Sequence, residues 1–330
     1  MPNATLSDAS IALMLSVRLA GPAARWAIAT LATAAAAACT GRTHDLGDNP
    51  PRAYHFETPR IVSELAFPLA RTDNPTLTAD LLEIYFTSDR AGQGDVWFAR
   101  RASADQAFGA PEPINVLNTS TFETSSAISA DGLTLWFGSD RVGGRGTTDI
   151  WVSSRPNRSA GWLAPINVNP LNTGVEDIPR PPGQHGLVMP LSSKQATSAV
   201  YQTFLAARAG AGAQFGAPVL VAELAFDNKS TVDGFLTDDG LTLFYSSQPL
   251  QFPLDAGPPS DAGIVTPFSD LSVAWRQSTS EPFDYVQALD DLNTGGDERD
   301  PWLTPDGKTL YFTSDRDGAL SIYTAAVKPR

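Results

Sequence analysis

Acidic side chains recur at two fixed distances before five short turns of the sequence, and they are the residues most capable of chemistry. The turns are anchored at Asp80, Asp131, His185, Asp239 and Asp306. Eight residues before the anchors stand Thr72, Glu123, Asp177, Thr231 and Glu298. Six residues before them stand Asn74, Ser125, Pro179, Asp233 and Asp300. Asp73 and Glu176 lie beside these two rows. If the rows converge in space, the gathered carboxylates would raise some pKa values and attract cations.

Other catalytic motifs are missing from the sequence. It contains no Gly-x-Ser-x-Gly nucleophile elbow, no His-Glu-x-x-His motif and no phosphate-binding loop. The glycine-rich stretch 210–216 leads into an expected strand rather than a helix, which argues against dinucleotide binding. The histidines are His44, His55 and His185, which lie in or beside a linker or in a turn. We therefore predict no catalytic residue, no cofactor and no metal site.

The turns that anchor the acidic rows belong to a unit that is repeated five times. Asp-Gly pairs such as Asp131-Gly132 separate alternating apolar residues, which is the pattern of a tight β-hairpin. The anchors are 51, 54, 54 and 67 residues apart, and the longest interval contains the low-complexity insertion 254–263. A third strand follows each hairpin, for example Asp95–Arg100, and a fourth is expected to start at Phe108, Trp162, Phe215 and Phe283. Four short antiparallel strands repeated at this period predict β-propeller blades.

The fifth repeat ends soon after its third strand, and the missing strand is found at the other end of the domain. Phe56–Phe67 aligns without a gap with Phe215–Phe226, which follows the third strand of the third repeat. We therefore predict an all-β fold: a five-bladed β-propeller of four-stranded antiparallel blades over residues 54–330. Residues 54–67 would form the outer strand of the last blade and close the ring, which removes strand edges that invite aggregation.

The first strand of a propeller blade is the innermost, so the acidic rows should meet at one mouth of the central channel. We predict a binding site there, formed by Asp73, Asn74, Glu123, Glu176, Asp177, Asp233, Glu298 and Asp300. The alternative is that these carboxylates only cap backbone donors of the loops. The recurring Ser-Asp-Arg triplets at 88–90, 139–141 and 314–316 are interpreted as structural, with Asp accepting backbone hydrogen bonds and Arg pairing locally.

The repeats resemble the TolB-type, WD-like β-propeller family of bacterial envelope proteins. The resemblance rests on Asp306–Arg316, preceded by Glu298-Arg299-Asp300-Pro301, and on Asp131–Arg141 followed by Asp149-Ile150-Trp151. It covers residues 54–330 and implies an envelope protein. The third repeat departs from the pattern, since His185 stands at its turn and Pro190 removes a ladder donor from its second strand. Five blades also depart from the six or more that are common in that family.

The N-terminal segment is typical of an export signal. Residues 1–38 combine a few basic residues with the short apolar stretch 26–38, the plan of a signal peptide, and Met14 is an alternative start to Met1. Ala36-Ala37-Ala38-Cys39 resembles a bacterial lipoprotein cleavage box, which implies lipidation of Cys39, the single cysteine. An ordinary signal peptide with an incidental cysteine is the alternative. Residues 39–53 are expected to form a flexible tether.

Composition limits the partners. The 330 residues include 23 basic and 36 acidic side chains, a net charge of −13, which argues against nucleic-acid binding. We expect an exported monomer, anchored to the outer membrane through its lipid alone, on the periplasmic or the cell-surface side.

The sequence therefore favours a non-enzymatic propeller that binds an envelope protein, peptide or polysaccharide at the acidic channel mouth. The first alternative is a glycoside hydrolase that uses channel carboxylates, because five-bladed propellers host such enzymes and Arg299-Asp300-Pro301 is similar to a motif found in them. The second alternative is a structural propeller in which divalent cations at the mouth stiffen the ring.

Overall fold

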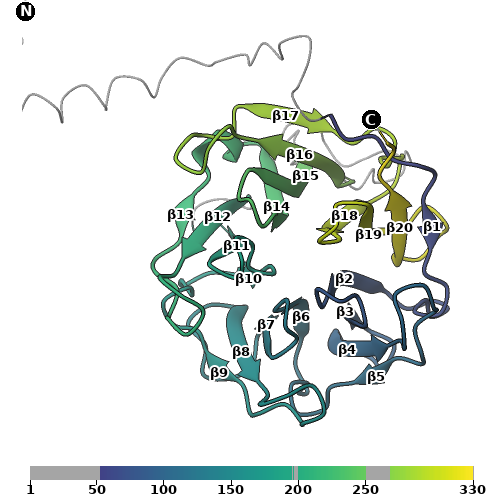
Figure 1. The fold of residues 1–330 in the computed structure, drawn as a ribbon. Helices are drawn as coiled ribbons and strands as arrows, with labels where there is room; N and C mark the ends of the chain where they lie inside the picture. Colours follow the sequence, from purple (N-terminus) through teal and green to yellow (C-terminus); the bar gives the residue numbers. More distant parts are fainter. Residues whose placement is uncertain (1–52, 195, 197–199, 250–267, 330) are drawn as a thin grey trace, which may run out of the picture. The chain divides into compact units, whose positions relative to one another are not determined.

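The computed structural model describes residues 53–194, 196, 200–249 and 268–329, and this part of the chain is almost entirely β-structure (Figure 1). Its strands form five four-stranded antiparallel sheets, arranged around a ring as the blades of a propeller. The predicted all-β fold and the predicted number of blades are thus confirmed. Cys39 and the expected signal peptide lie outside the described residues. Among the described residues, no helix is long and apolar enough to cross a membrane.

Each blade takes its strands in chain order from the channel outward, except the last. The first blade contains β2 (Thr72–Leu77), β3 (Glu83–Ser88), β4 (Asp95–Arg100) and β5 (Glu112–Pro113). The second contains β6 (Glu123–Ile128), β7 (Thr134–Ser139), β8 (Asp149–Ser154) and β9 (Ile166–Asn167). The third contains β10 (Asp177–Pro179), β11 (Val188–Lys194), β12 (Tyr201–Ala207) and β13 (Val219–Leu220), with a 3₁₀ turn at Ala222–Leu224 after it. The fourth contains β14 (Lys229–Leu236), β15 (Thr242–Pro249), β16 (Asp270–Trp275) and β17 (Tyr285–Ala288).

The last blade joins the two ends of the domain, as predicted. Its order is β18 (Glu298–Leu303), β19 (Thr309–Ser314), β20 (Ser321–Ala326) and β1 (Arg60–Ile61). Arg60 pairs with Thr324 and Ile61 with Tyr323. The Val62 N–H then donates to the Ile322 carbonyl over 2.9 Å, and Phe56 forms a further bridge with Val327. The N-terminal segment is therefore the outer strand that closes the ring.

The outer strands are shorter than expected and do not start at the aromatic residues. Phe108 precedes β5 by four residues, and Phe215 precedes β13 by the same interval. These rings are buried instead in the apolar clusters between neighbouring blades, where Phe108 packs with Leu77 and Phe86. The prediction of strands starting at Phe108, Trp162, Phe215 and Phe283 was wrong in its boundaries because these aromatic residues serve core packing, and the pairing begins only after them.

In the part of the chain that the structure describes, the apolar core forms five clusters, each lying between two adjacent sheets. The cluster between the fourth and fifth blades, for example, contains Phe244 and Trp275 of one blade and Phe312 and Tyr323 of the other. The apolar side chains of the strands therefore pack between neighbouring blades. The central channel is left to the first strands, whose polar residues form the candidate site.

The third blade is the irregular one, as the sequence indicated. Its first strand is paired only over Asp177–Pro179, whereas the other first strands contain six or eight residues. Pro181 and Pro182 follow, and neither can donate to the ladder. The second strand nevertheless continues through Pro190, whose carbonyl accepts the Arg180 N–H over 3.0 Å. The interruption ends the strand early and leaves Arg180 at the channel.

Candidate functional site

Four of the five first strands contain a register shift at the same place. The shifts lie between Asp73 and Thr76, between Thr124 and Ala127, between Val232 and Phe235, and between Arg299 and Trp302. In each case one residue has a left-handed φ: Asn74 (56°), Ser125 (51°), Asp233 (59°) and Asp300 (58°). These are four of the five residues that stand six before the anchors. The fifth is Pro179, which cannot adopt a positive φ.

These bulged residues are linked to one another around the channel. The Asn74 N–H donates to Asp300 Oδ2 over 3.1 Å, and Ser125 Oγ donates to Asn74 Oδ1 over 3.0 Å. The Asp300 N–H donates to Ser246 Oγ over 3.2 Å, and the Asp233 N–H donates to Ser192 Oγ over 3.1 Å. Asp233 and Asp300 also interact electrostatically, so the structure brings Asn74, Asp233 and Asp300 together where the first strands enter the channel.

Arg180 extends from the third blade into this group. Its side chain is fully buried, and its Nη1 contacts Asn74 Oδ1 at 3.3 Å and Asp300 Oδ1 at 3.6 Å. Nη2 donates to the Pro301 carbonyl over 3.4 Å. One guanidinium thus reaches the first and fifth blades and lies across the channel.

Two more arginines surround Asp73. Arg299 Nη2 lies 3.1 Å from Asp73 Oδ2, and Arg71 Nε lies at the same distance from that oxygen. Arg299 also pairs with Asp300 at 3.7 Å and with Asp297 at 3.5 Å. We call Asp73, Asn74, Arg71, Arg180, Asp233, Arg299 and Asp300 the mouth cluster. Its three aspartates are balanced by three arginines, so the mouth is not the bare acidic rim that the sequence predicted.

Burial sets the electrostatics of the mouth cluster. Burial removes the Asp233 carboxyl from water and Asp300 adds like-charge repulsion, which together raise the pKa of Asp233 to about 7. Burial also raises the pKa of Asp73, although Arg299 and Arg71 act in the opposite direction. Burial alone would lower the pKa of Arg299, but Asp73 and Asp300 raise it above its ordinary value. The polar side-chain atoms Asp73 Oδ1, Arg180 Nε and Arg299 Nε have no hydrogen-bond partner among the described residues.

The carboxylates that stand eight residues before the turn anchors lie outside the mouth cluster. Glu298 accepts hydrogen bonds from the Thr294 N–H and hydroxyl, both over 2.8 Å, and from Ser314 Oγ over 2.7 Å. Glu123 has the same arrangement with Thr119 and Ser139. Asp177 accepts from the Thr173 N–H and hydroxyl. These three buried carboxylates cap the loops that enter the second, third and fifth blades, and the structure does not bring them into the mouth cluster. Glu176 also lies apart and accepts a hydrogen bond from the Tyr201 hydroxyl.

The Ser-Asp-Arg triplets join each of three blades to the loop before it. Asp315 Oδ1 accepts the Asp297 N–H over 2.8 Å, and Arg316 donates to Ser314 Oγ and to the Leu292 carbonyl. The triplets at 88–90 and 139–141 make the equivalent contacts. Their predicted structural role agrees with this geometry.

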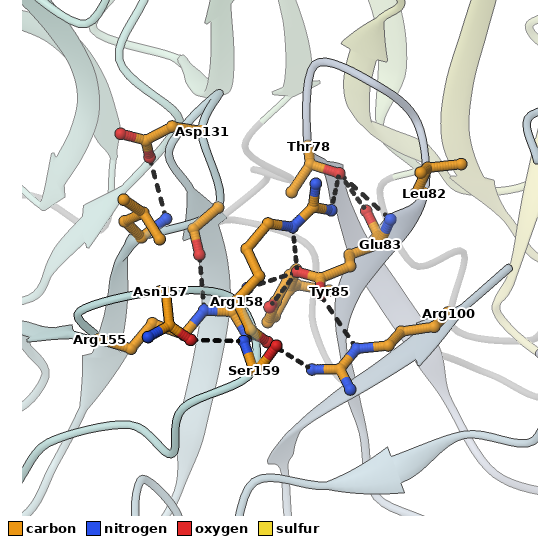
Figure 2. A network of polar contacts seen from close by, with 12 residues as sticks. Thr78, Leu82, Glu83, Tyr85, Arg100, Asp131, Arg155, Asn157, Arg158 and Ser159 are labelled. Carbon is orange, nitrogen blue, oxygen red and sulfur yellow. Dashed lines mark hydrogen bonds and ion pairs between the residues drawn. The ribbon is translucent and has the colours of Figure 1, made fainter. Parts of the chain in front are cut away.

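A second polar network joins the first and second blades (Figure 2). Glu83 of β3 accepts hydrogen bonds from Arg155 over 2.5 Å, from Arg100 over 3.0 Å and from the Tyr85 hydroxyl over 2.9 Å. Arg158 lies 3.5 Å from the same carboxylate. Burial and the nearby Glu83 charge raise the pKa of Tyr85. The charges satisfy one another between two blades, so this network is a structural contact.

Sequence reasoning missed the three arginines of the mouth cluster. Arg180 stands five before its anchor, where the other repeats have Pro75, Ser126, Gly234 and Pro301. The available signal was a long cationic side chain at a position of the inner strand where the other repeats have small residues. The third repeat was interpreted only as a departure from the pattern, on the grounds of His185 and Pro190, and Arg180 was passed over.

The comparisons with known proteins concern the fold. No protein-family model matches the chain, and no curated protein matches its sequence. Similar solved structures include TolB from Acinetobacter baumannii, which is 13% identical with a TM-score of 0.44; the match covers 78% of this chain and only 55% of that one. A Dyadobacter fermentans protein of unknown function is 12% identical with a TM-score of 0.50, over 84% of this chain and 99% of that one. An α-L-arabinofuranosidase from Lactobacillus brevis is 12% identical with a TM-score of 0.50, over 81% and 94%. At these identities the similarity is one of fold.

Proposed function

We propose that this chain is a non-catalytic propeller that binds a protein partner on one face of the ring. This is the face where the first strand of each blade begins, and we call it the first-strand face. The observation that carries the proposal is the position of Arg180, which is buried across the channel between Asn74, Asp300 and the Pro301 carbonyl. The three aspartates of the mouth cluster are buried, with residue exposures of 2% for Asp73, 8% for Asp233 and 1% for Asp300. A closed, charge-balanced channel supports binding across the face rather than entry of a substrate into it.

The loops around this mouth offer the residue types found at protein interfaces. Phe67 and Leu69 are exposed in the loop before β2, and Val142 is exposed in the loop between β7 and β8. Arg71 and Arg299 are the partly exposed cations of the mouth cluster. Arginine and aromatic side chains on a partly apolar surface are typical of protein-binding sites. The partner would present apolar side chains together with carboxylates.

Site-specific cross-linking tests this proposal. A photoreactive residue at Phe67 or Val142 should cross-link the same protein in the cells that make the chain, whereas one at Leu163 or Val219 should not. Those two control residues are as apolar and also exposed, but Leu163 precedes the outer strand β9 and Val219 lies in the outer strand β13. Cross-links from all four positions, or products that contain polysaccharide and no protein, would overturn the proposal.

Substitutions then test the surface and the carboxylates separately. Phe67→Asp with Val142→Asp should weaken capture of the cross-linked partner at least tenfold, and Leu163→Asp with Val219→Asp should leave it unchanged. Asp233→Asn with Asp300→Asn should also weaken it if the mouth cluster belongs to the interface. Unchanged binding by this last pair would remove the channel carboxylates from the site.

A glycoside hydrolase is the second candidate, and one observation favours it. Burial and the neighbouring Asp300 raise the pKa of Asp233 to about 7, and a pair of adjacent carboxyls that includes one with a raised pKa is what acid–base cleavage of a glycosidic bond needs. The burial of both groups and their pairing with arginines are the reasons to place it second. Turnover of arabinan, xylan or fructan that is abolished by Asp300→Asn would make it the better function.

The divalent-cation alternative finds less support. Within the described residues, no group of three or more His, Cys, Asp or Glu side chains is arranged to hold a metal ion. Three guanidiniums already balance the aspartates of the mouth cluster, which leaves little net negative charge to bind a further cation. Export and lipid attachment at Cys39 are part of the proposal on the sequence pattern alone, and mass spectrometry of the mature N-terminus would test them.

A further inference from the structure

A second site lies at the opposite end of the channel, where the hairpin turns gather. A pocket of about 350 Å³ opens there, and residues of all five blades line it. They come from the far ends of the first strands and from the turns that follow: Leu77, Ile128, Pro182, Leu236 and Trp302 are examples. The volume falls within the range of small-molecule pockets, about 300–1,000 Å³.

The inner part of the pocket is apolar and aromatic. Phe235 and Trp302 line it with their ring centroids 6.0 Å apart and their planes inclined at 59°. Leu77, Ile128 and Leu303 add aliphatic surface. Such rings attract a cation or pack against an apolar group, depending on what approaches them.

The charged residues that line the pocket are all aspartates: Asp238, Asp239 and Asp306. The side chains of Asp238 and Asp306 are 59% and 54% exposed, so they stand at the rim. Asp306 is held in place because its Oδ1 accepts from the Thr304 hydroxyl over 2.6 Å and from the Lys308 N–H over 3.1 Å. The Thr304 hydrogen bond also lowers the pKa of Asp306, so this carboxylate is ionised at neutral pH. The Lys308 ammonium lies 3.6 Å from Asp306 and the His185 ring lies 3.8 Å from Asp238, and both are exposed contacts that contribute little.

A positive charge, that of Arg180, lies deeper in the channel. Arg180 immediately precedes Pro181, which lines the pocket, and its guanidinium belongs to the mouth cluster. A ligand that entered this pocket would therefore meet carboxylates at the rim, apolar surface within and a cation beyond. A positive group would stay at the rim, while an apolar group would fill the interior.

We propose that this pocket binds a small organic cation, an ammonium group on an aromatic or aliphatic stem. The stem lies against Phe235 and Trp302, and the ammonium lies among Asp238, Asp239 and Asp306. The pocket is at the other end of the channel from the first-strand face, so its occupancy does not depend on the function proposed above.

Three probes of similar shape separate charge from apolar contact: phenethylammonium, phenethyl alcohol and 3-phenylpropanoate. Titration calorimetry on the whole mature protein should give an ammonium affinity at least tenfold above that of the alcohol, with the carboxylate weakest. The preference should shrink as salt is raised, because the rim aspartates are exposed to solvent. Equal affinities, or no heat from phenethylammonium at millimolar concentration, would overturn the proposal.

The variant Asp238→Asn with Asp306→Asn removes two rim charges and keeps the Oδ1 acceptors that hold the turns. It should lower the ammonium affinity at least fivefold and leave the alcohol affinity within twofold. The matched control is Asp105→Asn with Asp131→Asn, which removes two exposed turn charges outside the pocket lining. Phe235→Leu should weaken all three probes alike. An ammonium affinity that falls equally in the rim variant and in the control would show long-range charge attraction rather than this site.

Discussion

Asparagine, serine and aspartate occupy the bulged positions of this ring because the backbone there needs a left-handed conformation. Asn74, Asp233 and Asp300 have φ between 56° and 59°, a region that asparagine and aspartate enter more readily than most residues. The same residue types that suggest a ligand site are thus explained in part by the bulge. An asparagine would satisfy the backbone equally well, so the charges of Asp233 and Asp300 require a further reason, and their effect can be measured.

Asp233→Asn is expected to stabilise the protein above neutral pH. Asp233 has a raised pKa of about 7 in the folded state against an ordinary 3.8, so the folded protein binds this proton more tightly than the unfolded chain does. Its contribution is complete below about pH 4 and is lost as the pH rises through about 7. The variant should gain up to about 4 kcal/mol over wild type at pH 8, because each unit of pKa difference corresponds to about 1.4 kcal/mol.

Urea unfolding at pH 4 and pH 8 measures this difference. The two proteins should be nearly equally stable at pH 4 and should diverge at pH 8. Asp131→Asn, at an exposed turn, is the control and should show no such divergence. A variant that is less stable than wild type at pH 8 would mean that Asp233 is ionised and fully paired in the folded state.

At the scale of elements, arginines that follow the third strands tie the hairpin turn to the aromatic residue before the fourth strand of the same blade. Arg101, Arg208 and Arg276 each donate to a carbonyl of their own hairpin turn and lie over the aromatic ring that precedes the fourth strand, Phe108, Phe215 and Phe283. Arg155 does the same with Gly132 and Trp162, and it also reaches Glu83 of the preceding blade (Figure 2). The contact between the first two blades therefore contains a buried charge pair as well as apolar surface.

Arg155→Leu is expected to destabilise the protein by about 3–5 kcal/mol, because it leaves the buried Glu83 carboxylate without its closest partner. Adding Glu83→Leu should recover much of this loss, since no buried charge then remains. Arg100→Leu removes a more exposed partner of the same carboxylate and should cost less than about 1 kcal/mol. Denaturant unfolding of the four proteins gives the comparison. Equal losses for Arg155 and Arg100 would show that burial does not control the strength of these pairs.

The elements differ in how far the sequence alone could predict them. The strand Asp95–Arg100 was predicted with its observed bounds, because a short apolar run between two turns leaves little freedom. The outer strands could not be bounded in this way. Only two residues of β5 are paired, and the aromatic Phe108 that marks the repeat belongs to the core between blades. A repeating residue indicates a repeating environment, and it need not lie in the strand itself.

At the scale of the whole molecule, counting in register predicted part of the set of side chains that meet, and it did not predict how their charges are balanced. Asn74, Asp233 and Asp300 come together because equivalent positions of a closed ring face the same channel. Arg180 was missed because it is present in one repeat alone, and a method that looks for recurrence passes over it. Glu123 and Glu298 recur as well, but four residues earlier each finds a threonine whose N–H and hydroxyl it caps. That local partner keeps them out of the mouth cluster.

Closure of the ring is the property on which both channel sites depend, and Phe56 provides the test. Its side chain is buried with Phe312, Tyr323 and Trp275, although β1 itself pairs over only two residues. Phe56→Ala should therefore cost about 3–5 kcal/mol through the cavity it leaves. Ile61→Ala changes a solvent-exposed residue of the same strand and should cost less than about 1 kcal/mol.

Removing residues 1–62 should have a larger effect than Phe56→Ala, because β20 would become a bare edge beside an open apolar cluster. We expect this shortened chain to aggregate, and a synthetic peptide of residues 54–67 added during refolding should restore a cooperative thermal transition. A chain that starts at residue 54 should unfold like the longer protein. If the chain that starts at residue 63 were as stable as the one that starts at 54, the last blade would be complete without β1, and the pairing of Arg60 with Thr324 would make no contribution to the ring.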